Sequence, residues 1–272
     1  MTDERSYFPR KLNVVVPLGE SVHELIVVGR DEVGALAKVA ELLARHKVNM
    51  ISGGTYDADV SGQFLFSIFA NLANADCTPE KLVSELKGLA FVTRVSISDT
   101  EDVVYDQHLF PLVLFGGSRA VVVTAHSIVS MEQDLQKQLG RQGLQVLFEV
   151  GRSSGSNLGA LHKAMLPEAD RDTFLRTAKD DMRARGWGIV DVEVAEKASA
   201  KTRVTVQEPI FAGIEGARES WWLMGLVSGF LEAIYGLRTV VSGRPKFDAA
   251  KRVFSFDLVE YHPDARSARD LV

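Results

Sequence analysis

Cysteine is almost absent from this sequence. Cys77 stands alone among 272 residues, which excludes an internal disulfide framework and any cysteine-rich zinc site. The histidines are scattered, with no His-x-x-x-His pair, and a Gly-x-Gly-x-x-Gly nucleotide loop is missing. We therefore expect no metal, no cofactor and no catalytic residue that the sequence could identify.

Long hydrophobic runs and an excess of positive charge are also missing. The chain has 31 Lys and Arg against 36 Asp and Glu, which does not favour nucleic acid as a partner. No apolar run approaches the roughly 18 residues that span a bilayer, and residues 1–10 lack the apolar core of a signal peptide. We expect a soluble, cytoplasmic protein with no membrane contact, and the length favours two domains.

Residues 22–100 change hydrophobic period in the order strand, helix, strand, strand, helix, strand. Short apolar or alternating runs at 25–28, 48–56, 63–72 and 91–97 are typical of strands, with helical stripes at 36–43 and 79–87 between them. This order predicts a ferredoxin-like β-α-β-β-α-β domain. Residues 1–21 precede it as a separate segment, in which 12–16 could add a strand.

The first turn of this domain resembles that of an ACT domain. The resemblance rests on an Asp-x-x-Gly turn at Asp31 and Gly34 and on a Val-Asn-Ile type entry to the second strand. It implies a regulatory domain that binds a small effector and pairs side by side as a homodimer. The residues that it implicates in effector binding are Asp31, Glu32, Val33, Gly34, Ala35, Leu36, Asn49, Met50 and Ile51.

Glu32 and Val33 depart from the ACT pattern, in which arginine and proline are usual. Gly34 is retained, and it permits a positive φ or a close backbone approach. Two interpretations stay open: free N–H groups at the helix start hold an effector carboxylate, or Gly34 and Asp31 only form a tight turn. Glu32 would repel an anion if its side chain pointed at the site.

Residues 101–272 begin with helices and end with strands, after an acidic boundary at 98–102. Apolar residues recur at helical spacing from Ile128 to Leu139, around 144–165 and at 174–182, whereas 189–194, 203–206 and 253–258 alternate. Residues 222–235 are almost wholly apolar and helical in length. The pattern predicts a second α+β domain with an antiparallel sheet last.

This half is similar to 4-vinyl reductase domains, which bind small molecules. The similarity rests on residues 117–122, 147–151, 186–188 and 222–232 and on a closing hairpin at 237–259. Many members of that family carry zinc-binding cysteines near the last helix, but residues 219–260 contain none. We therefore expect no zinc.

A pocket in the second domain is the ligand site that we expect. It would lie between the helix around Phe148 and the helix 222–235, where glycines would leave room beside aromatic rings. The expected lining residues are Phe148, Trp187, Trp222, Gly225, Gly229 and Phe230. Adjacent Trp221 and Trp222 cannot share a helix face, so at most one should point to the core. The small residues at 153–157 suggest the close approach of another helix or a ligand.

Taken together, the sequence favours a regulatory small-molecule sensor over an enzyme. An effector would bind at the ACT turn, a hydrophobic or aromatic ligand in the second domain, or both. A protein partner would be needed for output, because no basic DNA-reading helix is visible. The alternative is an allosterically regulated enzyme acting on a hydrophobic or aromatic small molecule.

Overall fold

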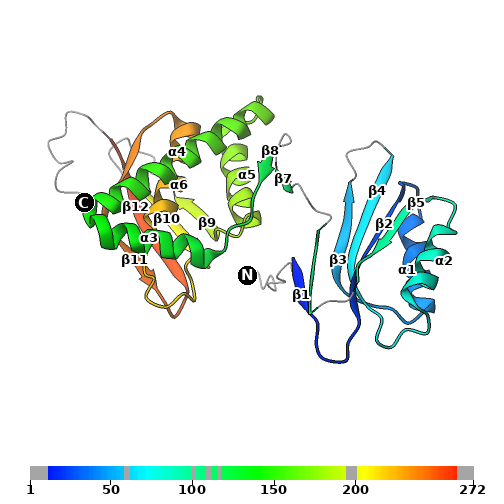
Figure 1. The fold of residues 1–272 in the computed structure, drawn as a ribbon. Helices are drawn as coiled ribbons and strands as arrows, with labels where there is room; N and C mark the ends of the chain where they lie inside the picture. The colour runs from blue at the N-terminus through cyan, green and yellow to red at the C-terminus, as the bar shows by residue number, and fades with distance from the viewer. Residues whose placement is uncertain are drawn as a thin grey trace. The chain divides into compact units, whose positions relative to one another are not determined.

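The chain folds into two compact units, Met1–Pro111 and Leu112–Val272 (Figure 1). The computed structural model describes residues 12–57, 62–99, 102–107, 112–114, 118–193 and 201–261. The sequence places the boundary at residue 100, and the structure moves it to 111. The reason is β6 (Val103–Tyr105), which pairs with β1 (Asn13–Val15) and so belongs to the first unit. In the described part of the chain, no helix has the length and apolarity to cross a bilayer.

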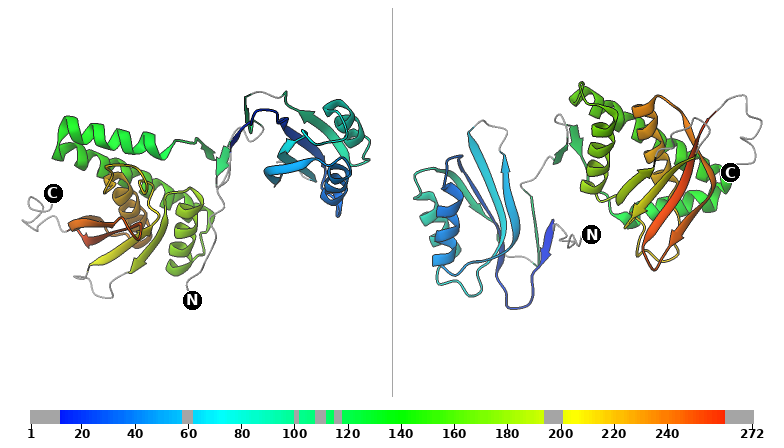
Figure 2. Two further views of the ribbon diagram at one scale, coloured as in Figure 1. Left: turned by 90° about the horizontal axis from the view of Figure 1, so that it is seen from below. Right: turned by 180° about the vertical axis from the view of Figure 1, so that it is seen from behind.

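The first unit is a four-stranded antiparallel sheet with both helices on one face (Figure 2). α1 (Ala35–Arg45) and α2 (Pro79–Lys87) pack there on Leu25 and Val27, among other residues of the central strands. The expected element order is confirmed. In spatial order, the strands are β3 (Asn49–Asp57), β4 (Gln63–Asn71), β2 (Val22–Arg30) and β5 (Val92–Ile97).

Local signals set the helix ends in this unit. Gly34 precedes α1 with a φ of 87°, a backbone conformation that glycine adopts without steric cost. Thr78 caps α2 by accepting a hydrogen bond from the Lys81 backbone N–H, and Pro79 takes the first helical position. Gly88 is the C-terminal cap of the same helix. These positions were predictable because each signal is local.

The other face of the sheet is partly covered by the chain itself. β1 and β6 form a two-stranded ribbon, and Val14, Val16 and Val104 pack against Val22 and Phe69. The strand expected at residues 12–16 therefore forms, but it does not join the main sheet. Exposed apolar residues on this face of the sheet would favour a second subunit that covers them. The ribbon already covers some of these residues, so the argument for a subunit on this face is weaker.

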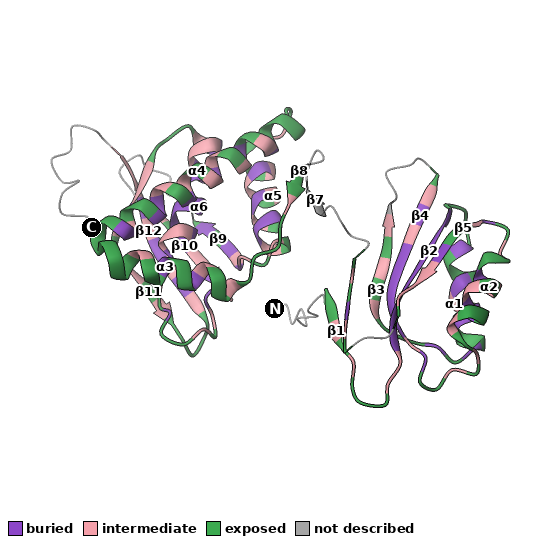
Figure 3. Ribbon diagram, viewed as in Figure 1, coloured by how far each residue is buried: buried purple, intermediate pink, exposed green. Residues whose placement is uncertain are grey.

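The second unit is the expected α+β domain. Three helices come first, α3 (Ala125–Leu139), α4 (Arg141–Met165) and α5 (Arg171–Ala184), after the short pair β7 (Leu112–Leu114) and β8 (Ser118–Ala120). α6 (Trp221–Tyr235) lies within the sheet-forming part and is buried over most of its length (Figure 3). The antiparallel sheet contains, in spatial order, β11 (Thr239–Asp248), β12 (Val253–Glu260), β10 (Thr202–Gln207) and β9 (Ile189–Glu193).

Glycines bring the backbones of α4 and α6 into direct contact. Gly151 and Gly155 on α4 face Gly225 and Gly229 on α6, and the contacts advance together along both helices, which therefore run parallel. A Cβ at any of these positions would lie 1.9 to 2.0 Å from a carbonyl oxygen of the other helix: that of Trp222, Leu226, Phe148 and Arg152, respectively. The small residues at 153–157 thus mark the approach of a helix. The expectation that Gly225 and Gly229 leave room for a ligand is wrong, because the α4 backbone occupies that space.

Replacing Gly229 with alanine tests this contact. Helix propensity alone would make Gly229→Ala stabilising by up to about 1 kcal/mol. The new methyl carbon, however, would lie 1.9 Å from the Arg152 carbonyl oxygen, and overpacking of this kind typically costs about 1–3 kcal/mol or more. We expect a net loss of about 2 kcal/mol in the free energy of unfolding, measured by urea denaturation.

Ser153→Ala is the matched control, since Ser153 is exposed on the same helix α4. It should change the free energy of unfolding by less than about 0.5 kcal/mol. A Gly229→Ala protein as stable as this control would show that the two helices can move apart at little cost.

Candidate functional site

The turn before α1 is an open surface at a helix N-terminus. No side chain caps this helix, and the first N–H groups of a helix have no partner within it, so an anion would be favoured there. The Glu32 carboxylate lies 3.9 Å from Arg30 Nη2, which partly offsets its charge. Of the nine residues expected at the effector site, Ala35 is buried and the others are exposed.

The two halves of this expected site lie at opposite ends of the sheet. Arg30, just before the turn, pairs with Gln63 of β4, whereas Asn49 pairs with Asn71 at the other end of β4. β2 and β3 are therefore parallel, and a nine-residue strand separates their corresponding ends by roughly 25 Å. Asp31 to Leu36 and Asn49 to Ile51 do not meet within one chain.

The aromatic residues expected to line a pocket pack mostly into the core. Phe148 and Phe230 are 7% and 1% exposed. The rings of Trp187 and Trp222 stack with their centroids 4.2 Å apart. Trp221 and Trp222 are both half-buried and packed against the core, whereas the sequence places at most one of them there. Of the expected lining residues, Trp187 and Trp222 are thus in contact, but there is no cavity between α4 and α6 because their backbones touch.

A cavity of about 210 Å³ lies beside α3 instead, between that helix, the start of α4 and residues 216–221. Val129, Leu144 and Trp221 contribute apolar wall, and Glu132 and Arg218 contribute charged groups. Glu132 was not among the expected site residues. Its signal in the sequence is an acid at helical spacing from Ile128 and Leu135, on the apolar face of this helix.

Glu132 is 7% exposed and held by the start of α6. Its Oε1 accepts a hydrogen bond from Ser220 Oγ at 2.7 Å, and Ser220 Oγ also caps α6 by accepting from the Leu223 backbone N–H at 3.1 Å. Burial raises the pKa of Glu132 to about 7, although the hydrogen bonds from Ser220 and from the Trp222 backbone oppose the rise. The carboxyl group can therefore exchange a proton near neutral pH.

Comparison with protein families finds no match, and comparison with curated proteins finds none either. Among solved structures, the chain is similar to the phenol-responsive sensory domain of the transcription activator PoxR. That likeness has 14% identity and a TM-score of 0.46, and it covers 57% of this chain and 85% of that one. The ACT domain from GTP pyrophosphokinase of Chlorobium tepidum is 17% identical with a TM-score of 0.26, covering 31% and 92%. A formyltetrahydrofolate deformylase from Burkholderia mallei is 22% identical with a TM-score of 0.26, covering 29% and 28%.

The raised pKa of Glu132 predicts a pH-dependent stability. A carboxyl group whose pKa rises from 4.5 to about 7 on folding contributes stability that is complete below pH 4.5 and is lost as the pH rises through about 7. At about 1.4 kcal/mol per pKa unit, the shift corresponds to a loss on the order of 3 kcal/mol. We expect the stability of the wild type to fall by this amount, relative to Glu132→Gln, between pH 4.5 and pH 8.

Tryptophan fluorescence during urea unfolding measures this effect in the second unit, which holds Trp187, Trp221 and Trp222. Other groups that titrate in this pH range, such as His46, are present in both the wild type and Glu132→Gln. Their contribution therefore cancels in the difference between the two stabilities. Asp134→Asn, an exposed acid on α3, should follow the wild type. A wild type that tracks Glu132→Gln at every pH would contradict the prediction.

Proposed function

We propose that this chain is a small-molecule sensor that binds a small aromatic ligand in the cavity beside Glu132. The observation that carries the proposal is a buried carboxyl group at the wall of a cavity that also contains Trp221. Burying an ionisable group costs free energy, and such groups with a perturbed pKa are concentrated at functional sites. The resemblance of this half of the sequence to ligand-binding 4-vinyl reductase domains supports the same function.

The size and lining of the cavity favour one class of ligand. At about 210 Å³, the cavity is larger than the cavities of roughly 150 Å³ that bind benzene. Val129, Leu144 and Trp221 suit an aromatic ring, and Glu132 suits one hydroxyl group on that ring. A single-ring compound with one hydrogen-bonding substituent satisfies both requirements.

Glu132 also offers a route from the ligand to the core. Ser220 is shared between Glu132 and the N-terminus of α6, and α6 is buried over most of its length. A ligand that competes with Ser220 for Glu132 would alter the cap of this helix. A protein partner that recognises the change would provide the output.

An enzyme that acts on an aromatic compound is the second candidate. A carboxyl group with a pKa of about 7 is matched to general acid–base catalysis at neutral pH. Turnover of a bound phenol, lost in Glu132→Gln, would favour this candidate over the sensor.

In the first unit, we propose an effector site that is completed by a second copy of the chain. β3 is an edge strand with Met50 and Ile51 exposed. Antiparallel pairing of β3 with β3 of another copy would place Asn49 to Ile51 of one chain at the end where Asp31 to Leu36 of the other lies. The effector would present its anionic group to the start of α1.

Phenol tests the cavity in the second unit. We expect phenol to bind the full chain roughly tenfold more tightly than benzene, because its hydroxyl can donate to Glu132. Glu132→Gln should reduce this preference about fivefold, since a neutral acceptor is weaker. Isothermal titration calorimetry measures both affinities.

Asp134→Asn is the control for the loss of one acid from α3, and it should bind phenol as the wild type does. Equal binding of phenol and benzene to the wild type, or no binding of either, would refute the cavity as a site for a hydroxylated ring.

Sedimentation velocity tests the composite site in the first unit. We expect the wild type to be a dimer at micromolar concentration and Ile51→Lys to weaken the dimer by roughly tenfold or more, because charge on an edge strand opposes pairing. Leu18→Lys, at an exposed position of the same unit, should remain dimeric. A monomeric wild type would exclude the two-chain effector site.

A further inference from the structure

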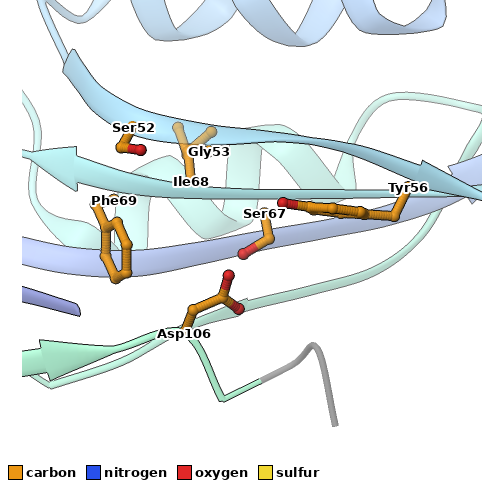
Figure 4. Close-up of a pocket in the computed structure, with 7 residues that line it drawn as sticks. All are labelled: Ser52, Gly53, Tyr56, Ser67, Ile68, Phe69 and Asp106. Carbon is orange, nitrogen blue, oxygen red and sulfur yellow. The ribbon is translucent and has the colours of Figure 1, made fainter. Parts of the chain in front are cut away.

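A second cavity, of about 260 Å³, lies on the face of the first sheet opposite α1 and α2 (Figure 4). Ser52 of β3 is the register partner of Phe69 of β4, and Tyr56 is the partner of Leu65. Ser52, Tyr56, Ser67 and Phe69 therefore share this face. Asp106, directly after β6, closes the cavity from the other side.

Asp106 presents a carboxylate oxygen that is buried and unpartnered. Its Oδ1 has no hydrogen-bond partner in the described part of the chain. The backbone fixes the residue, because the Asp106 N–H donates to the Leu12 carbonyl oxygen at 2.9 Å. In Figure 4 the carboxylate points toward the Ser67 hydroxyl, and the Tyr56 hydroxyl lies over the same space. An oxygen held in this way favours a hydrogen-bond donor in the cavity.

A second acid lies next to this space. Glu24 is 2% exposed, and its Oε1 accepts from Ser67 Oγ at 3.5 Å and from the Gln107 backbone N–H at 3.1 Å. Within the described ranges, no Lys, Arg or His forms a salt bridge with Asp106. The unpartnered Asp106 oxygen at the wall of the cavity makes its potential favour a cation.

We infer that this cavity binds a small primary amine in its ammonium form. The ammonium would donate to Asp106 Oδ1 and to the hydroxyls of Ser67 and Tyr56, as a group with three N–H donors can. The volume far exceeds that needed for one water molecule, and the Tyr56 and Phe69 rings suit a short apolar tail. A carboxylate on the ligand would be repelled by Asp106, so an amine is favoured over an amino acid.

This site is separate from the two sites proposed above, because its lining includes neither Asp31 to Leu36, nor Asn49 to Ile51, nor any residue of the second unit. Its ligand differs from both in charge. Its test therefore succeeds or fails independently of the sensor function.

Calorimetric titration of the full chain with n-butylamine tests the inference. We expect wild-type protein to bind n-butylamine and not butyrate at the same ionic strength. Asp106→Asn should weaken amine binding by roughly tenfold or more, since asparagine has a similar size but lacks the negative charge of the carboxylate. Circular dichroism of the variant verifies that it is folded.

Asp102→Asn is the matched control, because Asp102 lies on the same segment but is exposed. It should bind n-butylamine as the wild type does. The inference is overturned by any of three results: no binding to the wild type, equal binding of butyrate, or equal weakening by Asp102→Asn and Asp106→Asn. Should Asp106→Asn fail to fold, Ser67→Ala takes its place, and unchanged amine affinity in that variant counts against the site.

Discussion

The contact between α4 and α6 is the constraint on which the second unit depends. Four glycines let two backbones meet where any Cβ would collide with a carbonyl oxygen. The close approach sets α6 between α4 and the sheet, so that Leu223, Phe230 and the strand residue Phe254 join one core. Because α6 is held there, its N-terminus has a fixed position. Ser220, the N-cap of α6, therefore lies within hydrogen-bond distance of Glu132. The chemistry of the cavity is thus a consequence of helix packing.

Local signals account for what the sequence could predict. Examples are the capping of α2 by Thr78, the turn at Gly34 and the alternation of β12, each of which is determined within a few residues. Local signals of this kind along the chain suffice to predict the element order and the α+β class. The role of Gly229 could not be read in the same way. A glycine on an apolar helix is compatible with a cavity or with a close contact, and the choice depends on Arg152, which is far away in the sequence.

Long-range pairing explains the other differences. The valines of β1 favour a strand, but nothing local indicates that its partner is β6, roughly ninety residues later. That pairing shifts the unit boundary to residue 111. By contrast, the separation of Gly34 from Asn49 follows from topology alone, because a helix that links two parallel strands returns the chain to the opposite end of the sheet. The role of Glu132 could not be predicted for a further reason: its burial depends on the loop before α6, which is far away in the sequence.

The protonation of Glu132 has a consequence for the heat of any binding event at its cavity. At a pH somewhat below 7 the carboxyl group is largely protonated, because burial disfavours its anion. A ligand that donates a hydrogen bond to Glu132 stabilises the anion and expels a proton to the buffer, whereas a ligand that accepts one retains it. The observed enthalpy would then vary with the ionisation enthalpy of the buffer. Whether a proton is released to the buffer on binding therefore shows whether the ligand donates or accepts the hydrogen bond with Glu132.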